Sequence, residues 1–127
     1  MSRTVYDTRF FIEHYYSKDE NVLQRTKEEM RGREKYVSVI VIHEVYQLTL
    51  AHEGRESAVL RTTLLEKDFK IVKVDAEIAK GSAELRHRYK LSMADSMIAT
   101  TALHLKATCI SDDPHFQAVK EIKTRWI

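Results

Sequence analysis

Four acidic residues stand where a carboxylate is costly unless it binds something. Asp95 and Glu44 each fall on the apolar stripe of a predicted helix, while Asp7 and Asp113 follow short strand-like runs. A carboxylate on the core-facing side of a helix carries a desolvation cost unless it is paired or bound to a cation. Four clustered carboxylates also repel one another, and the usual resolution is Mg²⁺ or Mn²⁺, which prefer oxygen ligands. Such an ion is a standard device of phosphoryl chemistry.

Each of these residues also has a structural interpretation, and the sequence leaves both open. Ser92 and Asp95 fit an S-x-x-D capping box at the start of a helix. Asp7 and Asp113 are each, taken alone, more often helix caps than ligands, and a proline follows Asp113 as at a first helical position. Glu44 is too deep in its helix for a cap. Its alternative is to reach the rim and pair with a lysine or arginine.

Short β-rich runs alternate with helical patterns along the chain and must position these carboxylates. Strand patterns cover residues 3–7, 35–38, 69–74, 107–110 and 122–127. Helical patterns cover residues 8–16, 18–32, 39–54, 55–68, 75–90 and 92–105. We expect Gly32 and Gly54 to close the helices that precede them. The alternation predicts an α/β fold with a parallel sheet, helices on both faces and a site beyond the carboxyl ends of the strands.

Length and composition predict one domain, residues 1–127, of a globular protein. The chain is 43% hydrophobic and 31% charged, and its net charge is only +2, so a nucleic-acid site would be a local basic patch. The single cysteine, Cys109, excludes an internal disulfide and a cysteine-based zinc site. With no apolar run long enough to span a membrane, we expect a cytoplasmic protein.

Basic and histidine side chains offer weaker signals. Arg86, Arg88 and Lys90 surround Tyr89 just before the helix of Asp95, an arrangement that suits RNA contact. The favoured alternative is that these are cations at a helix C-terminus, where they offset the helix dipole. The histidines, including His115, lack metal-ligand spacing and are interpreted as surface or supporting residues.

Four motifs, in order and over nearly the whole chain, resemble the PIN domain, specifically the VapC-type toxin ribonucleases. They are an opening strand with Asp and Thr, a Ser followed by a Glu on the next helix, an Asp with a small-residue helix, and a Ser-x-Asp with a Phe. Each is short, but the four together are fairly specific. They read "VYDTRFFIE", "VSVIVIHEVYQL", "LSMADSMIATTAL" and "CISDDPHF".

The resemblance implies a metal-dependent endoribonuclease that hydrolyses RNA phosphodiesters. It implies that Asp7, Glu44, Asp95 and Asp113 are the catalytic and metal-binding set for Mg²⁺ or Mn²⁺. The implied fold is a PIN-like three-layer sandwich with a central parallel sheet of about five strands. The implied partners are a VapB-type antitoxin and a second copy of the chain in a homodimer.

The same resemblance extends to neighbouring polar residues. Thr8 and Ser111 would be polar supports near the ion. Asp112 adjoins Asp113, and whether the two share or exchange the role stays open. Arg9 stands where the family usually has Ser or Asn. Arg9 either contacts phosphate or pairs with a site carboxylate and weakens metal binding.

Three other function classes compete with an active toxin nuclease. A catalytically silent PIN module would act by binding a partner or nucleic acid. A haloacid-dehalogenase-type phosphatase would carry a D-x-D motif after the first strand, which is absent here. A ribosome-maturation nuclease of the same superfamily would usually carry a zinc ribbon, which one cysteine cannot supply.

Overall fold

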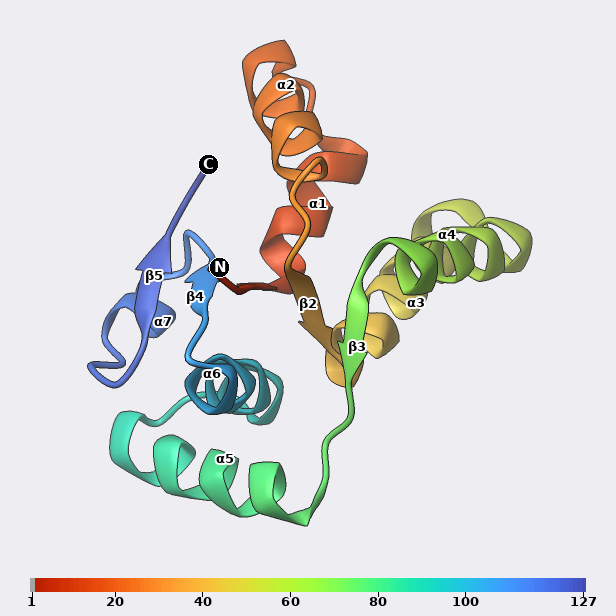
Figure 1. Ribbon diagram of the computed structural model, residues 1–127. Coiled ribbons are helices and arrows are strands. Elements are labelled where there is room, and N and C mark those ends of the chain that lie inside the picture. Colours follow the sequence, from red (N-terminus) through yellow and green to blue (C-terminus); the bar gives the residue numbers. More distant parts are fainter. Residues whose placement is uncertain (1) are drawn as a thin grey trace.

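A five-stranded parallel sheet forms the centre of the computed structural model, which describes residues 2–127 (Figure 1). Its order across the sheet is β3-β2-β1-β4-β5, and every neighbouring pair is parallel. The strands are β1 (Thr4–Tyr6), β2 (Lys35–Ser38), β3 (Lys70–Val72), β4 (Thr108–Ile110) and β5 (Lys123–Arg125). The predicted α/β fold with a parallel sheet is confirmed.

Seven helices flank this sheet within the described residues. In Figure 1, α1 and α2 lie on one side of the row of strands, α5 and α6 lie on the other, and α4 extends beyond β3. Gly54, with a φ of +91°, joins α3 to α4 as predicted. None of the helices in residues 2–127 combines the length and apolarity needed to cross a membrane. The helices are α1 (Thr8–Tyr16), α2 (Glu20–Glu29), α3 (Val39–Glu53), α4 (Arg55–Asp68), α5 (Ala76–Tyr89), α6 (Met93–Leu105) and α7 (Pro114–Gln117).

The central strand β1 marks the point where the order of strands reverses. From β1 the chain adds β2 and β3 on one side, then crosses over to place β4 and β5 on the other. In open α/β sheets, this switch point leaves a crevice beyond the carboxyl ends of the strands, where ligands bind. Two neighbouring strands, β1 and β4, therefore deliver the residues that follow them, Asp7 and Ser111, into one crevice.

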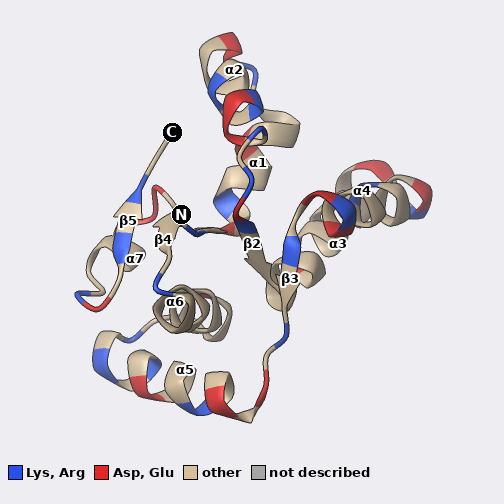
Figure 2. Ribbon diagram, viewed as in Figure 1, with Lys and Arg blue, Asp and Glu red and all other residues tan. Residues whose placement is uncertain are grey.

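Helix α6 is enclosed on most of its surface, and Asp95 is its single charged residue. In Figure 2, α6 is almost entirely tan, the colour of residues other than Lys, Arg, Asp and Glu, whereas α2, α4 and α5 carry many charged residues. Gly81 of α5 allows close contact with α6, because a Cβ there would lie 2.9 Å from Thr100 Cγ2. A carboxylate on such a helix is unusual and calls for a specific explanation. The buried residues of α6 are Ser96, Ile98, Ala99, Thr100, Thr101 and Ala102.

Several predicted boundaries were wrong by a few residues, and the last strand spans only Lys123–Arg125 rather than residues 122–127. The first strand stops before Asp7, because Asp7 caps α1. The second helix ends at Glu29 rather than at Gly32, which does not take the positive φ of a glycine cap. The third strand spans only Lys70–Val72, because the buried Phe69 ends α4.

Candidate active site

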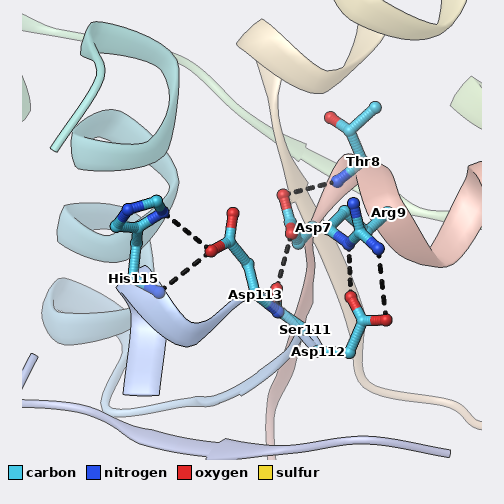
Figure 3. A network of polar contacts seen from close by, with 7 residues as sticks. All are labelled: Asp7, Thr8, Arg9, Ser111, Asp112, Asp113 and His115. Carbon is cyan, nitrogen blue, oxygen red and sulfur yellow. Dashed lines mark hydrogen bonds and ion pairs between the residues drawn. The ribbon is translucent and has the colours of Figure 1, made fainter. Parts of the chain in front are cut away.

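Asp7 is the most buried member of the acidic set, with 3% of its surface exposed. One carboxylate oxygen accepts a hydrogen bond from the Thr8 backbone N–H at 2.8 Å, which caps α1. The other accepts from the Ser111 hydroxyl at 2.6 Å (Figure 3). Ser111 directly follows β4, so this bond joins the ends of the two central strands. The cap and the place in the crevice are therefore compatible.

The environment of Asp7 disfavours negative charge. Burial raises the pKa of Asp7 from 3.8 to about 7, hydrogen bonds from Ser111 and Thr8 oppose this rise, and the charges of Asp95 and Glu44 add to it. A buried carboxyl with so high a pKa lacks a compensating cation. The pKa of Asp95 is also raised, first by burial and then by the charge of Asp113.

Asp95 and Asp113 come together from the start of α6 and the start of α7. Ser92 Oγ accepts from the Asp95 backbone N–H at 3.1 Å, so the serine caps α6. Asp113 caps α7 by accepting from the His115 backbone N–H at 2.9 Å. A carboxylate oxygen of Asp95, a carboxylate oxygen of Asp113 and a ring nitrogen of His115 all lie within 4.8 Å of one another. The caps by Ser92 and by Asp113 are confirmed and coexist with this cluster, but among residues 2–127 no bond from the Ser92 backbone N–H to the Asp95 carboxylate completes the capping box.

Glu44 enters the same crevice from α3. Its carboxylate accepts a 2.6 Å hydrogen bond from the Thr8 hydroxyl, and its side chain is half-buried. Within residues 2–127, no lysine or arginine forms an ion pair with Glu44, in contrast to the rim interpretation. Thr8 thus contacts two acidic residues, Asp7 through its backbone and Glu44 through its side chain.

Arg9 separates the roles of the two adjacent aspartates. Its guanidinium forms a two-pronged ion pair with Asp112, through Nε to one oxygen and at 3.3 Å to the other. Figure 3 shows Asp112 turned toward Arg9 and Asp113 turned toward His115. Arg9 therefore does pair with a carboxylate, but the partner is Asp112 and not Asp113, which belongs to the cluster. The pair is partly exposed and contributes at most about 1 kcal/mol to stability.

His115 is the member of the cluster that the sequence interpretation missed. Its Nδ1 lies 2.9 Å from Asp113 Oδ1, and its side chain is 70% exposed. The available signal was its position two residues after a helix-capping aspartate, since the first helical turn brings that residue back toward the cap. Metal-ligand spacing between histidines could not reveal it.

The basic segment before α6 makes contacts within the fold. Arg86 donates to the Leu91 carbonyl at 3.2 Å, and Arg88 forms an ion pair with Glu121. Tyr89 also donates to Glu121 and packs against the core. Lys90 ends α5 in a left-handed conformation. These contacts match the helix-terminus interpretation, and RNA contact by this segment stays a prediction.

The chemistry of the clustered donors fits Mg²⁺ or Mn²⁺. Carboxylates from four separate segments lie near enough for their charges to act on one another, and an all-oxygen set of this kind suits hard divalent cations. Burial first, and the neighbouring carboxylates after it, raise the pKa of Asp7 and of Asp95. Asp7, Asp95, Asp113 and Glu44 are the residues that would hold an ion.

Solved structures show the same fold. A chain of the DNA-bound VapBC complex from Salmonella typhimurium matches with a TM-score of 0.80 at 16% identity, covering 99% of this chain and 98% of that chain. A toxin–antitoxin complex from Klebsiella pneumoniae matches with a TM-score of 0.76 at 23% identity, covering 98% and 99%. VapC20 from Mycobacterium tuberculosis, described as a Sarcin-Ricin loop cleaving toxin, matches with a TM-score of 0.77 at 17% identity, covering 94% and 98%.

Sequence comparison gives the family directly. No curated protein matches the chain significantly. The family model of the PIN domain matches residues 4–122, which include strands β1 to β4 and all of the acidic set, while β5 follows the matched range. With the motifs, the sheet order and the acidic crevice in agreement, the chain belongs to the PIN domain family.

Proposed function

We propose that this protein is a metal-dependent endoribonuclease that hydrolyses RNA phosphodiesters, as the toxin of a VapBC-type pair. The observation that carries the proposal is the proximity of Asp7, Glu44, Asp95 and Asp113 at the β1–β4 switch point, where none of the four forms an ion pair with a lysine or arginine among residues 2–127. Membership of the PIN family and the likeness to a Sarcin-Ricin loop cleaving toxin support it.

The chain's own residues hold the acidic groups in place. When bound, Mg²⁺ or Mn²⁺ would lower the pKa of a coordinated water and stabilise negative charge on the phosphate oxygens. Ser111 orients Asp7 with its hydroxyl proton and accepts the Asp113 backbone N–H at 3.1 Å. Thr8 orients Glu44. We expect hydrolysis to leave a 5′-phosphate and a 3′-hydroxyl.

RNA cleavage by the purified protein tests this proposal. We expect a structured RNA to be cut with Mn²⁺ or Mg²⁺, to stay intact with EDTA, and to be cut again when excess metal is restored. The new ends should be degraded by a nuclease that requires a 5′-phosphate. Cleavage that persists in EDTA would contradict the proposal. Metal binding without cleavage of any RNA tested would favour the alternative, a silent module that binds a partner or nucleic acid.

Replacing Ser111 by alanine should weaken the site without removing a ligand. We expect metal affinity or cleavage to fall by about 10- to 100-fold, as for other groups that orient metal ligands. The reason is that Asp7 loses its 2.6 Å hydrogen bond and the Asp113 N–H loses its acceptor. Cleavage rates measured across a Mn²⁺ titration check this result. Ser82→Ala on α5 is the matched control, since that buried serine bonds only its own helix.

We infer a VapB-type antitoxin as the partner and a homodimer as the assembly, acting in the cytoplasm. Several of the solved structures that share this fold are, by their own descriptions, VapBC or toxin–antitoxin complexes. An apolar cavity of about 450 Å³ lies between α1 and α4, beside the exposed Leu60 and Leu64. Exposed apolar patches of this kind mark protein interaction sites.

A second proposal concerns how RNA is held near the crevice. Arg9, Arg86, Arg88 and Lys90 are the predicted phosphate contacts. Lys90 forms no ion pair within residues 2–127, whereas Arg9 and Arg88 are paired with Asp112 and Glu121. Arg86 has no ion pair there but donates to the Leu91 carbonyl, so Lys90 is the member of this set that meets a phosphate without first losing a side-chain contact of either kind.

A further inference from the structure

His115 faces the acidic cluster in a fixed position. A single oxygen, Asp113 Oδ1, lies 2.9 Å from both the backbone nitrogen and the ring Nδ1 of His115. The backbone of this turn is held by Pro114 at the first helical position and by the fully buried Phe116. The imidazole is therefore presented beside the carboxylate by the turn itself, although the ring is 70% exposed.

The two clustered carboxylates have no basic side chain paired with them in the described part of the chain. Within residues 2–127, neither Asp95 nor Asp113 forms an ion pair with a lysine or arginine, and Arg9 is held by Asp112. The other member of the cluster is His115. Two carboxylate oxygens and one imidazole nitrogen thus lie within 4.8 Å of one another. An ion bound through His115 Nδ1 would replace the proton that this nitrogen shares with Asp113 Oδ1, and that proton would be released to water.

The spacing of these donors suits a transition-metal ion. With ligand bonds of about 2.1 Å, donor atoms around an octahedral ion lie about 3 to 4 Å apart. The three atoms here lie within 4.8 Å of one another, so small side-chain shifts would bring them around one ion. Imidazole nitrogen is a ligand for the transition metals, whereas Mg²⁺ strongly prefers oxygen and retains its waters. A site that includes the His115 nitrogen should therefore bind Mn²⁺ in preference to Mg²⁺, whereas a site of oxygen ligands alone accepts both ions.

We propose that His115 is a direct nitrogen ligand of the ion, alongside Asp95 and Asp113, and that it makes the site favour Mn²⁺ over Mg²⁺. This proposal rests on the proposed function, because it concerns the same site. It adds a ligand that the acidic motifs do not contain, and it assigns that ligand a role in metal preference.

Pulsed electron paramagnetic resonance of bound Mn²⁺ tests the ligand directly and does not depend on RNA cleavage. We expect a nitrogen hyperfine coupling typical of imidazole in the wild type, and its loss in His115→Gln. Calorimetry should show Mn²⁺ affinity falling at least about tenfold in that variant, with Mg²⁺ affinity changed by less than about twofold. His87→Gln, an exposed histidine on α5, is the matched control and should retain both properties.

The outcomes separate this proposal from the proposed function. Mn²⁺ that binds without nitrogen coupling would overturn the role of His115 and leave the acidic site standing. Coupling that survives in His115→Gln would assign the nitrogen to another residue and would equally overturn it. Failure of the wild type to bind Mn²⁺ or Mg²⁺ at all would instead remove the metal site on which the proposed function depends. Circular dichroism confirms that the variants are folded.

Discussion

Asp95→Asn is expected to reduce metal-dependent RNA cleavage by about a thousandfold or more. Losing a charged ligand forfeits several kcal/mol of transition-state stabilisation, and each 1.36 kcal/mol corresponds to about tenfold in rate. The fold should persist, because the helix cap is the bond from the backbone N–H of residue 95 to Ser92 Oγ, which the substitution leaves in place. Loss of the charge also relieves repulsion from Asp113 and Glu44, so the metal-free protein should be no less stable. Single-turnover cleavage and thermal unfolding measure the two effects.

Asp19→Asn supplies the matched control for that substitution. Asp19 caps α2 by accepting from the backbone N–H groups of Asn21 and Val22, and it has no part in the acidic cluster. Asparagine caps helices about as well as aspartate does. This variant should therefore cleave RNA at the wild-type rate. Wild-type cleavage by Asp95→Asn as well would assign Asp95 to helix capping alone and contradict the site.

Asp7→Asn is expected to stabilise the metal-free protein while abolishing its activity. Because burial raises the pKa of Asp7 from 3.8 to about 7, the ionised carboxylate costs at most about 4 kcal/mol above neutral pH, at 1.36 kcal/mol per unit. Asparagine removes the charge and still accepts from the Thr8 N–H. The variant should thus exceed the wild type in free energy of unfolding at pH 8 in EDTA.

The pH dependence of this difference identifies its cause. Below about pH 4, Asp7 is protonated in both folded and unfolded chains, so the two proteins should be similar. Between about pH 4 and 7 the unfolded wild type releases a proton that the folded state retains, so the wild type loses stability as pH rises. Above about pH 7 the gap should be constant. Urea unfolding across this range measures it, and a gap independent of pH would contradict the assignment.

Saturating Mn²⁺ should reverse the order of stability. An ion that binds only the folded state stabilises it by mass action, and the wild type has the intact ligand set. Asp7→Asn should gain less from the same concentration. A stability advantage of Asp7→Asn that is unaffected by Mn²⁺ would place Asp7 outside the metal site.

Local sequence signals determined most of the elements and the members of the acidic set. Helix caps at Asp7, Ser38, Asp75 and Ser92 set the starts of four helices, since each cap bonds a backbone N–H within its own first turn. The same short range explains the errors at helix and strand ends, where burial of single residues such as Phe69 decided the boundary. The expectation that the carboxylates meet at the strands' carboxyl edge also followed from a parallel sheet alone.

Only the tertiary structure decided which side chains meet in the crevice. The order of the sheet placed β4 next to β1, and so brought Ser111 within 2.6 Å of Asp7 across 104 positions of sequence. The tertiary structure also paired Arg9 with Asp112, so that Asp113 clusters with Asp95 and His115 instead. Periodicity and capping act over one or two turns, whereas these pairings depend on strand order and on burial, which no local pattern encodes.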